Sequence, residues 1–164
     1  MLVPMNPEDT ILNIQLRLQT AFEMGPFGEL DYLPPRKSRK HSVLSVIGNI
    51  VGKRTGHIWS SKRCFYQFRI LTPPMDRYGA VNFICYYNFA ECGKGKHWQV
   101  VWDILAAFCD RHPQFSLNDS GGKFAGLHHR YSVSKYSGFP EEEAFADMKD
   151  LIEETYPKLN LLKV

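Results

Sequence analysis

The sequence RCFYQFRIL, residues 63–71, alternates between two kinds of side chain. Strand side chains point to opposite faces in turn, so this pattern predicts a strand with one dry face and one mixed face. The dry face carries Cys64, Tyr66, Phe68 and Ile70. The mixed face carries Arg63, Phe65, Gln67 and Arg69.

Two further runs have the same alternation. The sequence AVNFICYYNFA, residues 80–90, has one face that is apolar or aromatic throughout, and we expect it to pair antiparallel with residues 63–71. Residues 124–136 also alternate, and their polar face includes His128 and Arg130. The opposite face places His129 between Leu127 and Tyr131, which indicates a hydrogen-bonded core histidine. The glycine-containing stretch 118–123 precedes this strand and predicts a turn.

Three segments have helical spacing. The first begins at Pro7 with Asn6 as its cap, and Ile11, Ile14 and Leu18 form its apolar stripe. The second covers residues 98–109 and ends before Pro113. The third begins near Pro140, has three glutamates in its first turn and is expected to stop at Pro157.

Two other segments are less regular. Residues 30–41 contain Pro34-Pro35 and a run of basic residues, which predicts an exposed basic loop. Residues 42–51 fit either a short helix capped by Ser42 or a strand, because their apolar spacing is helical while their β-branched content favours a strand. We favour the helix here.

These elements predict an α+β fold: a small, mostly antiparallel sheet of three to four strands with three to four helices packed mainly on one face. Residues 1–164 are expected to form a single globular domain with an apolar C-terminal tail, residues 157–164.

Composition excludes several classes of protein. Hydrophobic residues make up 44% of the chain and aromatic residues 13%, which argues against disorder, collagen and coiled coils. The absence of a long apolar run excludes a membrane span, and the N-terminal residues do not resemble a secretory signal. The four cysteines form no CxxC pair, which favours reduced thiols and a cytoplasmic location.

Charge is distributed unevenly. The formal net charge is only +3, yet residues 32–75 hold nine lysines and arginines and no acidic residue. Both ends of the chain are acidic. Such asymmetry indicates an anionic partner.

The leading hypothesis is therefore a non-catalytic protein that binds nucleic acid or another polyanion through residues 36–69. Lysine and arginine would neutralise phosphates, and two aromatic residues would stack on bases. The candidate binding residues are Arg36, Lys37, Arg39, Lys40, Lys53, Arg54, Trp59, Lys62, Arg63 and Tyr66. A continuous positive face with residues from both 36–40 and 53–63 would favour this hypothesis, whereas dispersal over opposite sides or neutralisation by the acidic last helix would weaken it.

Two alternatives remain open. A small phosphodiester or phosphotransfer enzyme would use His128 and Arg130, with His57 as a further candidate, as base and phosphate clamp. A homodimeric interaction module would use the acidic last helix or the tail 157–164. We expect no cofactor and no metal site, since the spacing of Cys85, Cys92 and His97 is atypical of structural zinc sites.

Overall fold

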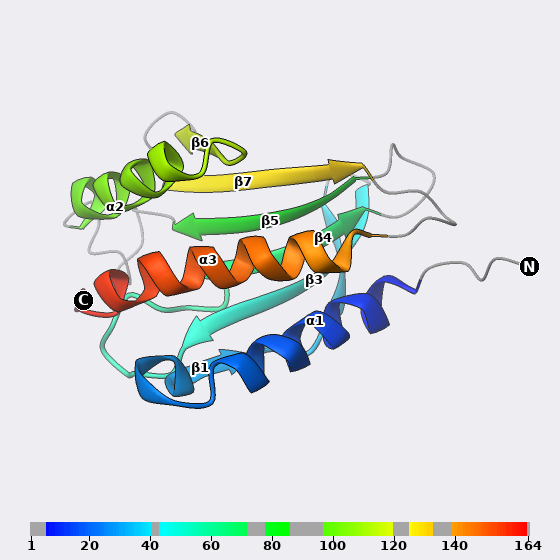
Figure 1. Cartoon of the computed structure of the whole chain (residues 1–164), viewed down its shortest axis with the longest axis horizontal. Coiled ribbons are helices and arrows are strands. Elements are labelled where there is room, and N and C mark those ends of the chain that lie inside the picture. The colour runs from blue at the N-terminus through cyan, green and yellow to red at the C-terminus, as the bar shows by residue number, and fades with distance from the viewer. Residues whose placement is uncertain are drawn as a thin grey trace, which may run out of the picture.

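The computed structural model describes residues 6–40, 43–71, 78–85, 97–119, 125–132 and 139–163. In this part of the chain, three α-helices pack against an antiparallel sheet of seven strands, which is an α+β fold (Figure 1). The elements in chain order are α1 (Pro7–Ala21), the 3-10 helix η1 (Gly25–Glu29), β1 (Leu30–Tyr32), β2 (Arg36–Lys40), β3 (Val43–Gly52), β4 (Cys64–Leu71), β5 (Tyr78–Cys85), α2 (Trp98–Arg111), β6 (Ser116–Asp119), β7 (Ala125–Ser132) and α3 (Glu141–Leu159).

The sheet has the strand order β1-β3-β4-β5-β7-β6, and β2 pairs with the same edge of β3 as β1. The predicted antiparallel pair is confirmed as β4 and β5. The expected number of strands, three to four, is too low. The additional strands are the short edge strands β1, β2 and β6 together with β3, and Asn118 and Asp119 belong to β6 although a turn was expected there.

The expectation of a helix over residues 42–51 is wrong, because β3 begins at Val43 and ends at Gly52. This strand lies between β2 and β4, and Val46, Ile47 and Ile50 are all buried. A strand buried on both faces is apolar along its length, so apolar spacing alone did not distinguish it from a helix. Its β-branched residues were the better indicator.

The expectation that residues 30–41 form one exposed loop is also wrong. The segment contains β1 and β2, which pair with β3 on either side of Pro34 and Pro35. Proline lacks the N–H group that a ladder requires, so the edge strand is interrupted there. The side chains of Arg36, Lys37 and Arg39 are exposed, as is typical of an edge strand protected from pairing with another chain.

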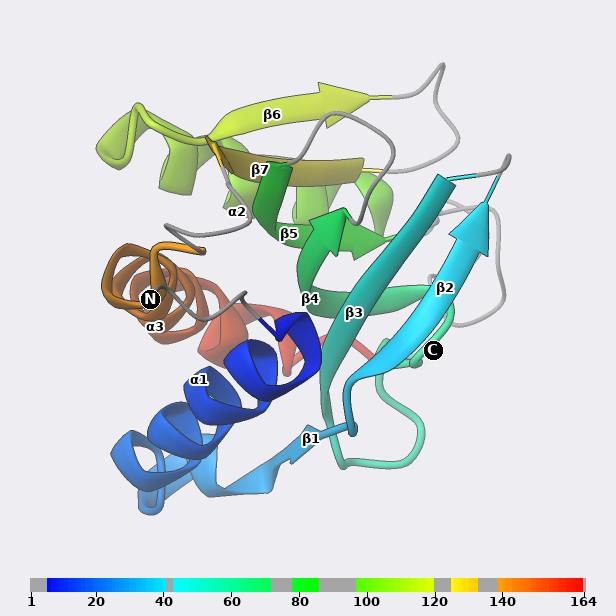
Figure 2. The same ribbon diagram turned by 90° about the vertical axis from the view of Figure 1, so that its right-hand side faces the viewer.

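All three α-helices lie on one side of the sheet. In Figure 1, α1 and α3 lie in front of the strands, and in Figure 2 they lie to the left while β2 and β3 form the right-hand edge. Helix α1 packs on β3, α2 on β6 and β7, and α3 on β5 and both other helices. The core between these layers includes Ile14, Leu18, Tyr66, Phe68, Leu105, Phe108, Leu151 and Ile152.

Helix α1 begins where the sequence predicts. The side chain of Asn6 accepts hydrogen bonds from the backbone N–H groups of Glu8 and Asp9, which caps the helix. The helix then approaches β3 so closely that only glycine fits at position 48. A Cβ atom there would lie 2.5 Å from the Cγ2 atom of Ile11 and 2.8 Å from the Nε2 atom of Gln15.

The C-terminal residues are part of the fold. The prediction that the last helix stops at Pro157 is wrong, because α3 continues through Pro157 and ends at Leu159, about half a turn later. Leu159 is fully buried, and the carbonyl of Leu162 accepts a hydrogen bond from the N–H of Ile58. Among the described residues of this segment, Leu161 is the large apolar side chain that remains exposed, at 75%. A homodimer through the tail stays a prediction.

Candidate anion-binding face

The strand register aligns three arginines across one face of the sheet. Arg36 of β2 and Arg69 of β4 both lie directly opposite Ile47 of β3, and Arg69 and Arg130 of β7 both lie opposite Ala80 of β5. Directly opposite residues of antiparallel strands project to the same face. We call these five residues the arginine row.

The arginine row points away from the helices. Gly48, the neighbour of Ile47 along β3, faces Ile11 of α1, so Ile47 faces the other side. His129, the neighbour of Arg130, contacts Asp147 of α3, which places Arg130 on the side opposite α3. We call this side the helix-free face, because no helix in the described part of the chain covers it (Figure 2).

Arg69 occupies the middle of the row and carries an unsatisfied donor. Its side chain is only partly exposed, and its Nε atom is buried without a hydrogen-bond partner in the described structure. A guanidinium group has five N–H donors and stays charged, so a buried donor without an acceptor destabilises the folded protein. Arg69 therefore places a positive charge that is partly exposed on the helix-free face.

A second row beside the arginines is polar and neutral. The register aligns Asn49, Gln67, Asn82, His128 and Ser116 across β3, β4, β5, β7 and β6. Burial lowers the pKa of His128, and the charges of Arg130 and His129 lower it further. His128 is therefore uncharged at neutral pH and offers both a donor and an acceptor to a ligand.

Acidic residues are scarce on this face. Among the described strand residues of the helix-free face, Asp31 near the end of β1 is the one carboxylate, four positions along β3 from the arginine row. Three glutamates of the acidic helix α3 bind cations elsewhere: Glu142 binds Arg17, Glu153 binds Lys149 and Glu154 binds Arg111. These three acids do not neutralise the basic segment.

A pocket of about 350 Å³ adjoins the arginine row at Arg36. It joins residues from the segment 30–41 with residues from the β3–β4 connection. Its lining residues are Leu33, Pro34, Arg36, Ile47, Asn49, Ser61 and Lys62. A hydrogen-bond chain supports its floor, since Gln67 donates to the Oδ1 atom of Asn49 and Asn49 donates to the carbonyl of Ser61, each at 3.0 Å. Arg36 and Lys62 therefore bring both halves of the predicted basic segment to one place.

The prediction that Trp59 and Tyr66 stack on bases is wrong. Tyr66 is fully buried and Trp59 is 8% exposed, and their rings stack on one another with centroids 5.5 Å apart. Trp59 donates to the Oδ1 atom of Asn160 at 3.0 Å, and the Tyr66 hydroxyl pairs with Thr155. The alternation that placed Tyr66 with Cys64 and Phe68 already indicated its burial.

The remaining candidate cations are divided. Lys37 and Arg39 alternate with Arg36 along β2, so the register turns them to the side of the helices. Arg54 pairs with Glu29 at 2.7 Å. The other candidates lie near strand ends: Lys53 is exposed after β3, Arg63 is partly exposed before β4, and Lys40 is the last residue of β2.

The three candidate catalytic residues do not form one cluster in the described structure. His57 pairs through its backbone with Lys163 near the C-terminus. His128 and Arg130 lie on β7, which is separated from the β3–β4 connection by β4 and β5. His128 and Arg130 share the helix-free face, one row apart.

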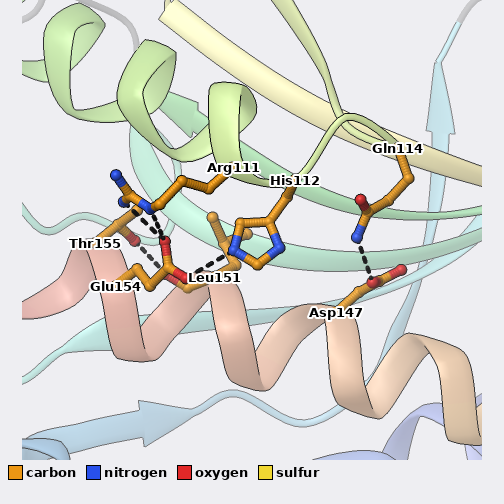
Figure 3. Close-up of polar contacts among 7 residues, drawn as sticks. All are labelled: Arg111, His112, Gln114, Asp147, Leu151, Glu154 and Thr155. Atoms are coloured by element: carbon orange, nitrogen blue, oxygen red, sulfur yellow. Dashed lines mark hydrogen bonds and ion pairs between the residues drawn. The ribbon is translucent and has the colours of Figure 1, made fainter.

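Sequence reasoning missed a polar cluster on the helix side. The buried carboxylate of Asp147 accepts from the hydroxyl of Tyr131 and contacts the Nδ1 atom of His129 at 2.7 Å. It also accepts from the side-chain amide of Gln114 at 3.2 Å, the contact that Figure 3 shows. Burial raises the pKa of Tyr131 well above its ordinary value, and the hydrogen bond to Asp147 raises it further. The prediction that His129 is hydrogen-bonded is confirmed, but its side chain is 24% exposed and therefore only partly buried. The cluster ties α3 to β7 and to the end of α2.

A second tie joins α2 to α3. Arg111 and His112, at the end of α2, bind the two carboxylate oxygens of Glu154 at 2.8 and 2.6 Å (Figure 3). Burial opposes ionisation of Glu154, but the hydrogen bonds from His112 and Arg111 outweigh it and hold its pKa below the ordinary value. Both ties are structural, and both lie on the side of the sheet opposite the arginine row.

No cluster of three or more His, Cys, Asp or Glu residues suited to a metal ion occurs in the described ranges, and Cys92 lies outside them. No described helix has the length and apolar character needed to cross a membrane. In comparisons with known proteins, no family model, curated protein or solved structure matches this chain.

Proposed function

We propose that this protein binds nucleic acid non-catalytically, by contacting the phosphate backbone with the helix-free face. The observation that carries the proposal is the arginine row, in which three cations share one face and the central one, Arg69, has a buried donor without a partner. Phosphate oxygens accept hydrogen bonds from guanidinium groups more strongly than neutral acceptors do. The side chain of Arg69 is partly exposed, so N–H donors of its guanidinium other than the buried Nε can contact a bound phosphate.

The spacing of the row favours a polymeric anion. Two strand spacings separate Arg36 from Arg69, and two more separate Arg69 from Arg130, so successive arginine Cα atoms are about 10 Å apart. One phosphate group cannot reach all three. A chain of phosphates crossing the strands can contact each of them in turn.

Phosphate contact, and not base stacking, is the mode of binding that we expect. Trp59 and Tyr66 are in the core. The exposed or partly exposed members of the two rows are Arg36, Arg69, Arg130, His128 and Ser116, whereas Ile47, Ala80, Asn49 and Gln67 are buried between them. Contacts to phosphates position a nucleic acid without reading its sequence. We therefore expect binding that depends little on base sequence and strongly on salt.

The test is the salt dependence of binding to a labelled single-stranded oligonucleotide and to its duplex, measured by fluorescence anisotropy. If Arg36, Lys62, Arg69 and Arg130 each contact one phosphate, log affinity against log salt has a slope of about −3 on the single strand and about −4 on the duplex. Changing Arg69 or Arg130 to Gln should flatten the slope by roughly 0.7 to 0.9 each.

Arg39→Gln is the matched control, because Arg39 is an exposed arginine that the register turns to the other side. It should leave the slope unchanged. Equal slopes for all variants, or no binding to either oligonucleotide, would refute the proposal. Binding to heparin but not to nucleic acid would assign the face to a different polyanion and would also refute it.

A phosphodiester or phosphotransfer enzyme is a second candidate, favoured by one observation. His128, whose pKa is lowered, lies one row from Arg130 on the same face, so an uncharged base and a phosphate clamp are adjacent. The test is cleavage of labelled RNA by the wild-type chain and by His128→Ala. Cleavage that persists unchanged in the variant, or no cleavage by the wild type, would remove this candidate.

A further inference from the structure

The pocket beside Arg36 has an apolar part and a positively charged part. Leu33, Pro34 and Ile47 supply apolar surface, whereas Arg36 and Lys62 supply positive charge from two segments that are distant in sequence. None of its described lining residues is acidic. A ligand suited to this lining has an apolar ring at one end and an anionic group at the other.

The floor of the pocket is held in place before any ligand binds. Asn49 and Gln67 are only 5% and 3% exposed. The side-chain amide of Gln67 donates to Asn49, and the side-chain amide of Asn49 donates to the backbone carbonyl of Ser61. The amide of Asn49 has two N–H groups, and the described contacts use one of them. The second remains available to a ligand, at little cost in reorganisation because the side chain is already ordered.

The size of the pocket agrees with that chemistry. Its volume, about 350 Å³, lies at the lower end of the range for small-molecule sites, roughly 300 to 1,000 Å³. An inorganic phosphate would leave the apolar wall unused. A mononucleotide would use the apolar wall for its base, the amide of Asn49 for a polar edge and the two cations for its phosphate.

We infer that this pocket holds one nucleotide of the bound strand, with its base against Leu33 and Pro34 and its phosphate between Arg36 and Lys62. This inference rests on the proposed function and refines it. Ile47 belongs both to the pocket lining and to the arginine row, so the strand can continue from the pocket toward Arg69. At this pocket a base, and not only a phosphate, is recognised.

The test is to titrate the full chain with adenosine 5′-monophosphate and, in a separate experiment, with inorganic phosphate. NMR chemical shifts measure the binding of each. We expect the nucleotide to bind more tightly than phosphate. Lys62→Gln should weaken nucleotide binding about tenfold, since one charge-assisted hydrogen bond is lost. Leu33→Ala should weaken nucleotide binding without changing phosphate binding. Arg39→Gln, which the register turns to the opposite side of the sheet, should change neither.

The outcomes separate this inference from the proposed function. If oligonucleotides bind with the expected salt slope while the nucleotide does not bind, or binds no better than phosphate, the pocket inference fails and the proposed function stands. If Lys62→Gln and Arg39→Gln weaken nucleotide binding equally, the assignment to this pocket is wrong. If neither oligonucleotide nor nucleotide binds, both fail.

Discussion

Arg36 and Arg69 lie on either side of Ile47, because the two strands that carry them pair with opposite edges of β3 at the same residue. The two arginines are 33 positions apart in the chain, yet the register gives them the same face. No ion pair in the described structure compensates the charge of Arg69. This arrangement favours an external anion and opposes the stability of the unliganded fold.

Replacing Arg69 by Met should therefore raise stability while it weakens oligonucleotide binding. The buried Nε donor without a partner costs roughly 1 to 3 kcal/mol, and Met removes it while filling similar space, so we expect the free energy of unfolding to rise by about 1 kcal/mol. Urea denaturation without ligand measures this change. Lys62 is exposed, so the free energy of unfolding of Lys62→Met should stay within about 0.5 kcal/mol of the wild-type value. A loss of stability in Arg69→Met would contradict the account of its Nε atom.

Two tyrosine substitutions should have opposite outcomes. Tyr131→Phe removes a hydrogen bond to the buried carboxylate of Asp147 and should lower the free energy of unfolding by about 1.5 to 3 kcal/mol. Tyr32→Phe removes a buried hydroxyl that has no partner in the described structure, and should leave stability unchanged or raise it. Thermal and urea denaturation compare the two variants directly. Equal losses would show that the Asp147 cluster contributes nothing specific.

The tie between α2 and α3 should depend on pH in a predictable direction. Because the pKa of Glu154 is lowered in the fold, its ionised form contributes stability above its unfolded pKa, and that stability is lost as the pH falls through the folded pKa. Glu154→Gln should cost about 1 to 2 kcal/mol at neutral pH, and the cost should shrink as the pH falls through the lowered folded pKa of Glu154. Glu153→Gln, which breaks an exposed pair with Lys149, should cost about 0.3 to 0.5 kcal/mol. A Glu154→Gln deficit that is independent of pH would exclude ionisation as its cause.

The C-terminal segment should act through stability. Asn160 is 7% exposed and accepts the hydrogen bond of the Trp59 indole, so Asn160→Ala should cost about 1 to 3 kcal/mol and alter Trp fluorescence. Leu161 is the exposed residue next to Asn160, so Leu161→Ala should leave the free energy of unfolding nearly unchanged. Sedimentation of both variants at the same protein concentration measures their molecular mass in solution and so tests the homodimer. A fall in mass for Leu161→Ala alone would support a homodimer through the tail.

Local patterns in the sequence were sufficient for several elements. The alternation in residues 63–71 and 124–136 correctly predicted the strands β4 and β7 and the face on which Arg69, His128 and Arg130 lie, although residues 124 and 133–136 are outside the described ranges. The sequence also correctly predicted that Asn6 caps α1 and that α3 begins near Pro140. In each case a short repeat or a terminal signal is enough, because the physical cause acts between residues close in sequence.

The same patterns failed where the deciding neighbours are distant. Residues 43–52 became a strand because β2 and β4 border them on both edges, and Trp59 became a core residue because Asn160 and Tyr156 meet it there. The β-branched content of residues 43–52 was the local indicator of this strand, whereas no pattern around Trp59 indicates its burial.

The charge asymmetry that the composition indicates became a surface only through strand pairing. The acid-free segment 32–75 places Arg36, Lys62 and Arg69 around one face and turns Lys37 and Arg39 to the other. Arg130, which lies outside that segment, joins the row because β5 aligns it with Arg69. Charge is a property of each residue and can be read along the chain, whereas its convergence depends on register between distant strands, which hydrophobic burial and backbone hydrogen bonding select together.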